Sequence, residues 1–260
     1  MCLIVFRLGA DGLTLAANRD EFRDRPAAPA APWPDAPRVV AGRDLRAGGT
    51  WLGVTAGGRW AALTNVRAQD VADARTDARS RGDLVSGFLR GDAAPQDAAM
   101  AAFSERDLYR GFNLLVGHGR EAWLASTRLN APCRLNAGVY GLSNDTLDTP
   151  WPKLVRARDA FARADGDAAR IAALRDTTVP PDEDLPETGI GTDNERFLST
   201  AFIDGPDYGT RVTTLVHVGR GTASLRELTW APGAGVDREV AWRTDGAGWQ
   251  RAALEPSGSV

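Results

Sequence analysis

Short apolar segments joined by tight turns dominate this sequence and constrain its fold more than any other feature. Residues 3–8 and 13–18 flank an Ala10-Asp11-Gly12 turn, and an Asp-Gly pair between two apolar runs favours a β-hairpin. Groups of such segments alternate with pairs of helix-patterned segments, and no regular strand–helix–strand rhythm connects them. The pattern therefore predicts an α+β fold with antiparallel sheets and segregated helices, and it argues against a doubly wound parallel sheet.

The helices are predicted from apolar residues that recur with a period near 3.6. Residues 80–103 show this spacing. A further helix is expected to start near Pro150, since Thr149 suits the N-cap and proline suits the first helical position. Another is expected at about residues 167–175, after Gly166. Helical segments thus lie between the strand groups rather than after each strand.

Strands and loops follow from alternating apolar residues and from clusters of Gly, Pro and Asp. We expect strands at residues 3–8, 13–18, 51–55, 59–65, 113–117, 122–126, 133–135, 139–142, 212–218, 223–230 and 239–243. The segments 133–135 and 139–142 are expected to pair with each other. Residues 26–37 and 177–192 are expected to form loops. No repeat or linker divides the chain, so we expect one domain over residues 1–260, with a frayed tail after about residue 254.

Composition excludes several classes of protein. The sequence is 43% hydrophobic and 25% charged with a net charge of -3, which is typical of a soluble globular protein and excludes a disordered or fibrous chain. No apolar run approaches the roughly 20 residues of a membrane helix, and the early run stops at Arg7, so we expect a cytoplasmic protein without a membrane span. Acidic residues outnumber basic ones, which argues against a nucleic-acid partner. Lys153 is the only lysine, a bias typical of GC-rich bacterial coding.

Metal and disulfide chemistry are not expected. Cys2 and Cys133 are the only cysteines, too few for a disulfide framework or a four-cysteine zinc site. No metal-binding motif is present, so we expect no protein-bound metal and no resident cofactor. Cys133 is expected to be buried without a role, and Trp33 is expected to be exposed in the proline-rich segment.

Cys2 is the residue whose chemistry is most informative. Removal of the initiator methionine would leave a cysteine that carries both a thiol and a free α-amine. Their unperturbed pKa values are about 8.5 and about 8, so a neutral amine can act as the base for its own side chain. The alternative is that Cys2 is a small buried hydrophobic residue at the start of an apolar strand.

The polar run Asn18-Arg19-Asp20-Glu21 ends the hairpin that Cys2 begins. Pairing across the turn is expected to bring residues 18–20 beside residues 2–4. A carboxylate there can hold the ammonium of a nucleophilic residue or fix an arginine. The alternative is a solvated loop of four polar residues.

Several segments together resemble the NRDE family, also called the transport-and-Golgi-organisation family. These segments occur in a consistent order over residues 1–211. They are residues 1–4, 18–21, 48–53, 62–67, 141–144, 148–153 and 208–211. The family in turn resembles the N-terminal-nucleophile hydrolases, in particular the cysteine-type bile-salt and penicillin V acylases. That resemblance implies a four-layer αββα sandwich of two antiparallel sheets.

The resemblance also implies roles for individual residues. Cys2 matches the nucleophile, and Asp20 matches the aspartate that holds its amine. Asn144 matches the side-chain donor of the oxyanion hole, and Arg196 matches an arginine near the thiol. The residues that it marks as candidates for substrate binding are Asn18, Arg19, Asn65, Arg67 and Arg211.

One position departs from the acylase pattern. The acylases carry an arginine three residues before the aspartate, where this chain has Ala17, and the arginine here is Arg19. Because adjacent strand residues point to opposite faces, Arg19 need not replace the missing arginine. The departure bears on how the pKa of Cys2 is set and on amidase activity.

The sequence predicts a cysteine hydrolase that acts on an amide or another acyl bond of a small molecule. The family resemblance implies an alternative, a non-catalytic protein that binds or carries haem, a lipid or acyl-CoA in the same cleft. Haem is therefore a possible ligand, with His118, His217, Cys2 or Met100 as candidate axial ligands. A Cys/His dyad with Cys2 is conceivable, but both histidines are better explained as structural or solvated residues. The oligomeric state stays open.

Overall fold

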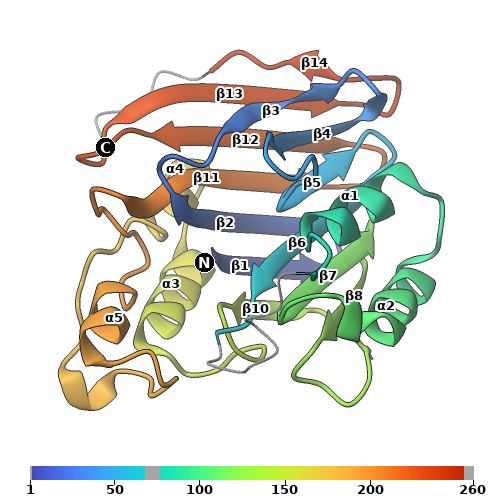
Figure 1. Ribbon diagram of the computed structural model, residues 1–260. Coiled ribbons are helices and arrows are strands. Elements are labelled where there is room, and N and C mark those ends of the chain that lie inside the picture. Colours follow the sequence, from blue (N-terminus) through green and yellow to red (C-terminus); the bar gives the residue numbers. More distant parts are fainter. Residues whose placement is uncertain (1, 68–76, 255–260) are drawn as a thin grey trace.

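Two antiparallel sheets of seven strands each form the centre of the molecule (Figure 1). The computed structural model describes residues 2–67 and 77–254. Sheet A has the order β10(Gly138–Leu142), β1(Cys2–Gly9), β2(Gly12–Phe22), β11(Tyr208–Val218), β12(Ala223–Trp230), β13(Val236–Thr244), β14(Gln250–Arg251). Sheet B has the order β3(Ala27–Trp33), β4(Ala36–Asp44), β5(Leu52–Thr55), β6(Arg59–Asn65), β7(Phe112–His118), β8(Glu121–Ser126), β9(Cys133–Arg134).

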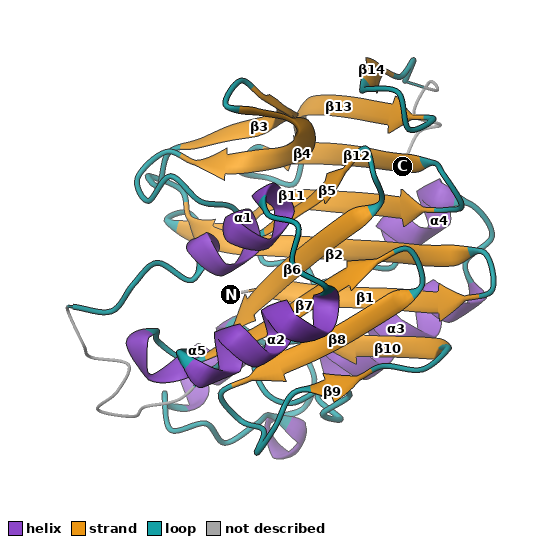
Figure 2. Ribbon diagram, turned by 90° about the vertical axis from the view of Figure 1, so that its right-hand side faces the viewer, coloured by secondary structure: helices purple, strands orange, loops and turns teal. Residues whose placement is uncertain are grey.

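Helices cover the outer face of each sheet (Figure 2). On sheet B lie α1(Gly82–Arg90) and α2(Pro95–Ser104), and on sheet A lie α3(Pro152–Arg163) and α4(Asp167–Ala172). The short helix α5(Thr192–Phe197) follows a loop with a 3-10 turn at Asp182–Asp184, and another such turn, Arg106–Leu108, follows α2. The expected four-layer αββα sandwich is confirmed.

Three apolar clusters fill the spaces between the layers, because burial of apolar surface is the main favourable term in folding. The cluster between the sheets includes Phe6, Leu15 and Trp60. A second cluster packs α3 and α4 on sheet A, and a third packs α1 and α2 on sheet B. Both sheets therefore share one central core. Among the described residues, every helix is too short or too polar to traverse a lipid bilayer.

The proline-rich segment forms strands rather than the expected loop. β3 lies at the edge of sheet B and pairs with β4 through an irregular register. Proline lacks a backbone donor, and an edge strand needs donors on one side only, so it tolerates Pro29 and Pro32. Trp33, expected to be exposed, is buried and donates its indole N–H to the Ala41 carbonyl at 3.1 Å.

Two other expectations were also wrong. The segments at 133–135 and 139–142 do not pair with each other: β9 pairs with β8 in sheet B, and β10 pairs with β1 in sheet A. The few residues between them carry the chain from one sheet to the other, which sequence spacing cannot distinguish from a hairpin. Cys133 is exposed, not buried.

The helix boundaries differ from the expected ones by a few residues. Residues 80–103 divide into α1 and α2, separated by Gly91 and the residues that follow it. α3 begins at Pro152 with Trp151 at the N-cap position, not at Pro150 with Thr149. The expected tail falls outside the described residues.

A buried carboxyl connects the two sheets. Glu227 of β12 is 1% exposed, and its Oε1 accepts a hydrogen bond of 2.7 Å from the backbone N–H of Ala30 in β3. Burial raises the pKa of Glu227 to about 7, although Ala30 and Arg19 act in the opposite direction. The folded protein therefore keeps a proton on this side chain that the unfolded chain loses near pH 4.

This raised pKa predicts a pH-dependent loss of stability. Between about pH 4 and pH 7 the unfolded state loses its proton first, so the free energy of unfolding falls as the pH rises. The loss is about 3 kcal/mol, because the pKa differs by more than two units between the two states. The Glu227→Gln side chain cannot ionise, so the variant escapes this loss. Its free energy of unfolding minus that of the wild type is therefore expected to rise by about 3 kcal/mol from pH 4 to pH 8. Urea denaturation at both values measures it, and parallel pH profiles would contradict it.

Candidate active site at the start of the first strand

The hairpin register places Cys2 beside the polar run of β2. Cys2 of β1 lies directly across from Arg19, and Leu3 lies across from Asn18, as expected from pairing around the turn. Ile4 belongs to the core between the sheets, whereas Leu3 belongs to the core under α3. Because side chains alternate along a strand, Cys2 and Arg19 lie on the face toward sheet B, and Asn18 lies on the opposite face.

The thiol is a weak acid in this environment. Cys2 is partly exposed, and burial raises the pKa of its thiol. The nearby Asp20 carboxylate raises this pKa further, whereas the Arg19 guanidinium and the backbone N–H of Asp20 lower it. Since the net change is upward, the thiol is protonated near neutral pH and needs a base to become a nucleophile.

Asp20 is buried and directly follows Arg19, the residue that lies across from Cys2. Its Oδ1 accepts a hydrogen bond of 2.7 Å from the hydroxyl of Thr210, and the Tyr208 hydroxyl donates to its backbone carbonyl at 3.0 Å. Burial raises the pKa of Asp20, while Lys153, Thr210 and Arg67 lower it. The carboxyl is thus fixed beside the start of β1, among basic side chains.

Lys153 is a functional candidate that the sequence did not reveal. It is 3% exposed at the start of α3, and its Nζ donates to the Leu198 carbonyl at 2.7 Å. Burial and the neighbouring Arg67 lower the pKa of Lys153 to about 8, against the influence of Asp20. An ammonium with such a pKa can give up its proton near neutral pH. The signal in the sequence was that Lys153 is the only lysine in the chain.

Asn144 and Asn65 contact each other directly. The side-chain Nδ2 of Asn144 donates to the backbone oxygen and to the side-chain Oδ1 of Asn65, both at 3.0 Å. Ser143 connects this pair to the first strand, because its hydroxyl lies 3.2 Å from Asn144 Oδ1 and 3.5 Å from the Cys2 carbonyl oxygen. The amide expected to stabilise an oxyanion therefore lies near Cys2 but is held by Asn65.

Arg67 and Glu195 form a buried ion pair at the same end of the sheet. Arg67 Nη1 and Glu195 Oε2 are 2.5 Å apart, and the guanidinium lies over the Trp151 ring at 4.9 Å. Glu195 also accepts a hydrogen bond from the Thr188 backbone. This side chain was not identified from the sequence, whereas its neighbour Arg196 was.

The expectation that Arg196 lies near the thiol is wrong. Its guanidinium is exposed and pairs with Asp182 at 2.6 Å and with Asp193 at 2.8 Å. Successive residues of a helix point in different directions, so α5 turns Glu195 inward and Arg196 outward. Arg19 and Arg67 are buried guanidinium groups at this end of the sheets, whereas Arg196 is exposed.

Asn18 and Arg211 are hydrogen-bonded within the protein rather than directed at Cys2. Asn18 Nδ2 donates to the carbonyls of Leu174 and Ala201, both at 2.8 Å, and its Oδ1 accepts from Thr213. Arg211 donates to the carbonyl of the last residue of β2 and to two carbonyls of the segment that follows it. Asn18 faces the helices because it lies on the opposite face from Cys2, so neither residue is in place to bind a substrate beside the thiol.

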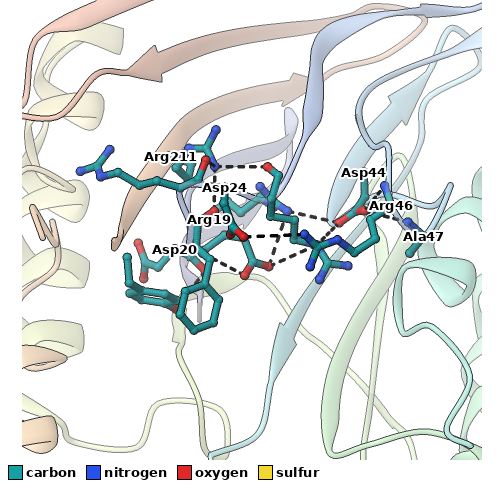
Figure 3. Close-up of polar contacts among 12 residues, drawn as sticks. Arg19, Asp20, Asp24, Asp44, Arg46, Ala47 and Arg211 are labelled. Carbon is teal, nitrogen blue, oxygen red and sulfur yellow. Dashed lines mark hydrogen bonds and ion pairs between the residues drawn. The ribbon is translucent and has the colours of Figure 1, made fainter. Parts of the chain in front are cut away.

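The side chain of Arg19 lies on the same face of β2 as Ala17, which is also the face of the Cys2 thiol. Residues 17 and 19 are two apart and share a face, so the expectation that Arg19 need not replace the missing arginine is corrected by the register. Arg19 Nη2 lies 3.3 Å from Asp44 and 3.6 Å from Glu21. Figure 3 shows this network, with Arg211 at one end and Asp44 and Arg46 at the other.

The histidines lie in structural hydrogen bonds. His217 contacts the Thr14 hydroxyl at 3.2 Å and Asp167 at 3.0 Å, so both of its ring nitrogens are engaged. His118 Nε2 lies 3.0 Å from the Gly57 carbonyl. Met100 is half exposed on α2. These candidate haem ligands lie on separate elements, β11, β7 and α2, and haem binding stays a prediction.

A large cavity of about 1000 Å³ lies elsewhere on the molecule. It is lined by α4, β12 and β13, including Ile171, Trp230 and Trp242. None of its lining residues belongs to the group around Cys2. A much smaller hollow is lined by Arg67, Trp151 and Lys153, among others.

The two packed sheets between helix layers, with a partly exposed cysteine at the start of the first strand, define an αββα protein with a candidate nucleophile at Cys2. The chain belongs to the family described as Transport and Golgi organisation 2, which matches residues 1–230. The resemblance inferred from the sequence is thereby confirmed.

Relatives and solved structures are similar over most of the chain. The Transport and Golgi organization protein 2 homolog of Bos taurus is 32% identical over 247 residues, which is 84% of this chain and 88% of the relative. The Homo sapiens homolog is 33% identical over the same shares. Among solved structures, a Caenorhabditis elegans N-acylethanolamine-hydrolyzing acid amidase ortholog is 12% identical with a TM-score of 0.49, covering 83% of this chain and 92% of that one. A C2A mutant of the conjugated bile acid hydrolase of Clostridium perfringens is 9% identical, also at 0.49, covering 98% and 97%.

Proposed function

We propose that this protein is a cysteine hydrolase that cleaves an amide or another acyl bond of a small molecule. The observation that carries the proposal is the position of Cys2 at the start of β1, where Arg19 and Asp20 influence its ionisation and where Cys2 in turn raises the pKa of Lys153. Perturbed ionisable groups gathered around a nucleophile are typical of active sites.

The proposed mechanism begins with removal of Met1, which leaves Cys2 with a free α-amine. The neutral amine takes the thiol proton, and the sulfur attacks the acyl carbon to form a tetrahedral intermediate. Asn144 Nδ2 donates to the oxyanion, which replaces Asn65 Oδ1 as its acceptor. The ammonium, held by Asp20, returns the proton to the leaving group as the carbon–leaving-group bond breaks. Water then hydrolyses the thioester and restores the thiol.

This role for Asn144 predicts a specific kinetic defect. Asn144→Ala is expected to lower kcat by about 10²–10³-fold, because it removes an oxyanion donor. The control is Asn136→Ala, since Asn136 is exposed and its side chain makes none of the hydrogen bonds described above. A steady-state assay compares the two, and equal rates in both variants would remove Asn144 from the mechanism.

The proposal is tested with a panel of amides, esters and thioesters that share one acyl group. Catalytic release of the leaving group, at many turnovers per protein, supports the hydrolase. The alternative, a carrier of haem, a lipid or acyl-CoA, predicts binding without turnover. Haem binding is measured by absorbance during a haem titration. If the protein bound haem saturably and hydrolysed no acyl compound, the carrier function would be supported and the hydrolase proposal contradicted.

A further inference from the structure

The Arg19 side chain is buried with one nitrogen lacking an acceptor. Arg19 is 5% exposed, and its Nη1 has no hydrogen-bond partner within the described residues 2–67 and 77–254. An unsatisfied buried donor costs about 1–3 kcal/mol, and more for a charged group. Such groups are rare in native proteins and mark strain or a ligand.

The guanidinium is held in place by its other contacts. Nη2 pairs with Asp44 at 3.3 Å, and the planar group lies over the Trp51 ring, 4.3 Å from its centroid. Asp44 in turn accepts a hydrogen bond of 2.6 Å from Arg25 Nε. Because Asp44 and Trp51 fix the guanidinium, Nη1 is a preorganised donor on the thiol's side of sheet A.

Arg19 and Asn144 flank Cys2 from opposite sides. β1 lies between β10 and β2, so Asn144, which follows β10, is on one side and Arg19 of β2 is on the other. Neighbouring strands are about 4.8 Å apart, so the backbones that carry the two donors are about two strand spacings apart. A ligand that meets donors on both sides of Cys2 presents one oxygen to Asn144 and a second oxygen to Arg19.

The charges around Arg19 favour an uncharged acceptor. Arg19 and Arg25 are balanced by Glu21 and Asp44. Farther out, Arg46 pairs with Asp24 and Arg23 pairs with Asp204, and Arg211 donates to backbone carbonyls. The buried Glu227 carboxyl is also near enough to interact with Arg19. Because the ion pairs in direct contact with Arg19 already balance, a carboxylate placed here would add a buried negative charge to them, which is unfavourable.

We propose that Arg19 Nη1 donates a hydrogen bond to an uncharged carbonyl oxygen of the substrate, adjacent to the carbonyl that Cys2 attacks. The substrate class is therefore an acyl compound with a second neutral oxygen next to the scissile group. This inference rests on the proposed function, in that Cys2 is the reacting group.

Alkylation of Cys2 tests the inference without any need for turnover. Iodoacetamide places a neutral carbonyl oxygen next to the carbon that sulfur attacks, and iodoacetate places a carboxylate there. Both rates are measured at Cys2 by peptide mass spectrometry in a Cys133→Ser background and divided by the rates with glutathione. We expect the ratio of the iodoacetamide rate to the iodoacetate rate to be about tenfold higher at Cys2 than for glutathione. A tenfold ratio corresponds to about one charge-assisted hydrogen bond.

Variants assign this preference to Arg19. Arg19→Lys keeps the charge but loses the fixed planar donor, so the preference is expected to disappear. Arg43→Lys is the matched control, since Arg43 also lies over a tryptophan, Trp33, at 4.6 Å, but pairs with Asp35. The wild-type ratio is decisive even if Arg19→Lys does not fold.

Three results would overturn the inference. A preference for iodoacetate would mean that the acceptor is a carboxylate, and a wild-type ratio equal to that of glutathione would mean that no contact forms. If the Arg19→Lys variant kept the preference for iodoacetamide, a group other than Arg19 would cause that preference. A preference for iodoacetamide without hydrolysis of any acyl compound would support the Arg19 contact while contradicting only the proposed function.

Discussion

Cys2→Ala is expected to abolish turnover of an acyl substrate, with a loss of at least about 10³-fold, because the variant has no atom that can form the covalent intermediate. Cys2→Ser keeps a nucleophilic atom, but a hydroxyl ionises far less readily than a thiol, so we expect a loss of similar order. The measurement is kcat/KM for one acyl compound in all variants. Folding should be retained, since Cys2 is partly exposed at the end of a strand.

The matched control for this prediction is the other cysteine. Cys133→Ser removes an exposed thiol from β9, on the far sheet, and is expected to leave kcat/KM unchanged. If Cys2→Ala retained the wild-type rate, Cys2 would not be the nucleophile. If both substitutions abolished activity, the loss would not be specific to Cys2.

Glu195→Ala is expected to destabilise the fold by about 3–5 kcal/mol, because it leaves the buried Arg67 guanidinium without its carboxylate partner. Removing one partner of a buried ion pair is costly, since the remaining charge stays desolvated. The free energy of unfolding from urea denaturation measures the effect.

The next residue in the chain is a matched control. Arg196→Ala breaks two ion pairs, but both are exposed and solvent-screened, so the expected change is within about 1 kcal/mol. Equal destabilisation by the two substitutions would contradict the assignment of Glu195 as the inward side chain of α5.

The sequence predicted those parts of the fold that depend on local signals. The Asp11-Gly12 turn defines the first hairpin and so places Arg19 across from Cys2. The strand ends at 59–65 and 223–230 were predicted to the residue. By contrast, β9 and β10 join different sheets, and only long-range pairing decides that. The edge position of β3 explains its prolines, but nothing local indicates an edge.

The sequence predicted the site residues whose positions follow from the first hairpin. It did not predict those whose positions follow from the packing of helices on sheet A. Cys2, Asp20, Asn65 and Asn144 gather near one end of the sheets. Lys153 joins them only because α3 packs on sheet A, and Glu195 only because of the rotation of α5. That rotation is invisible in a six-residue helix without a clear apolar stripe, so the sequence could not test the match of Arg196 to an arginine near the thiol.

The most direct test is the mass of the N-terminal peptide after an acid quench during turnover. The account predicts that Met1 is absent and that a fraction of Cys2 carries the acyl group of the substrate as a thioester. A peptide that retains Met1, or that carries no acyl group while the substrate is being hydrolysed, would contradict it.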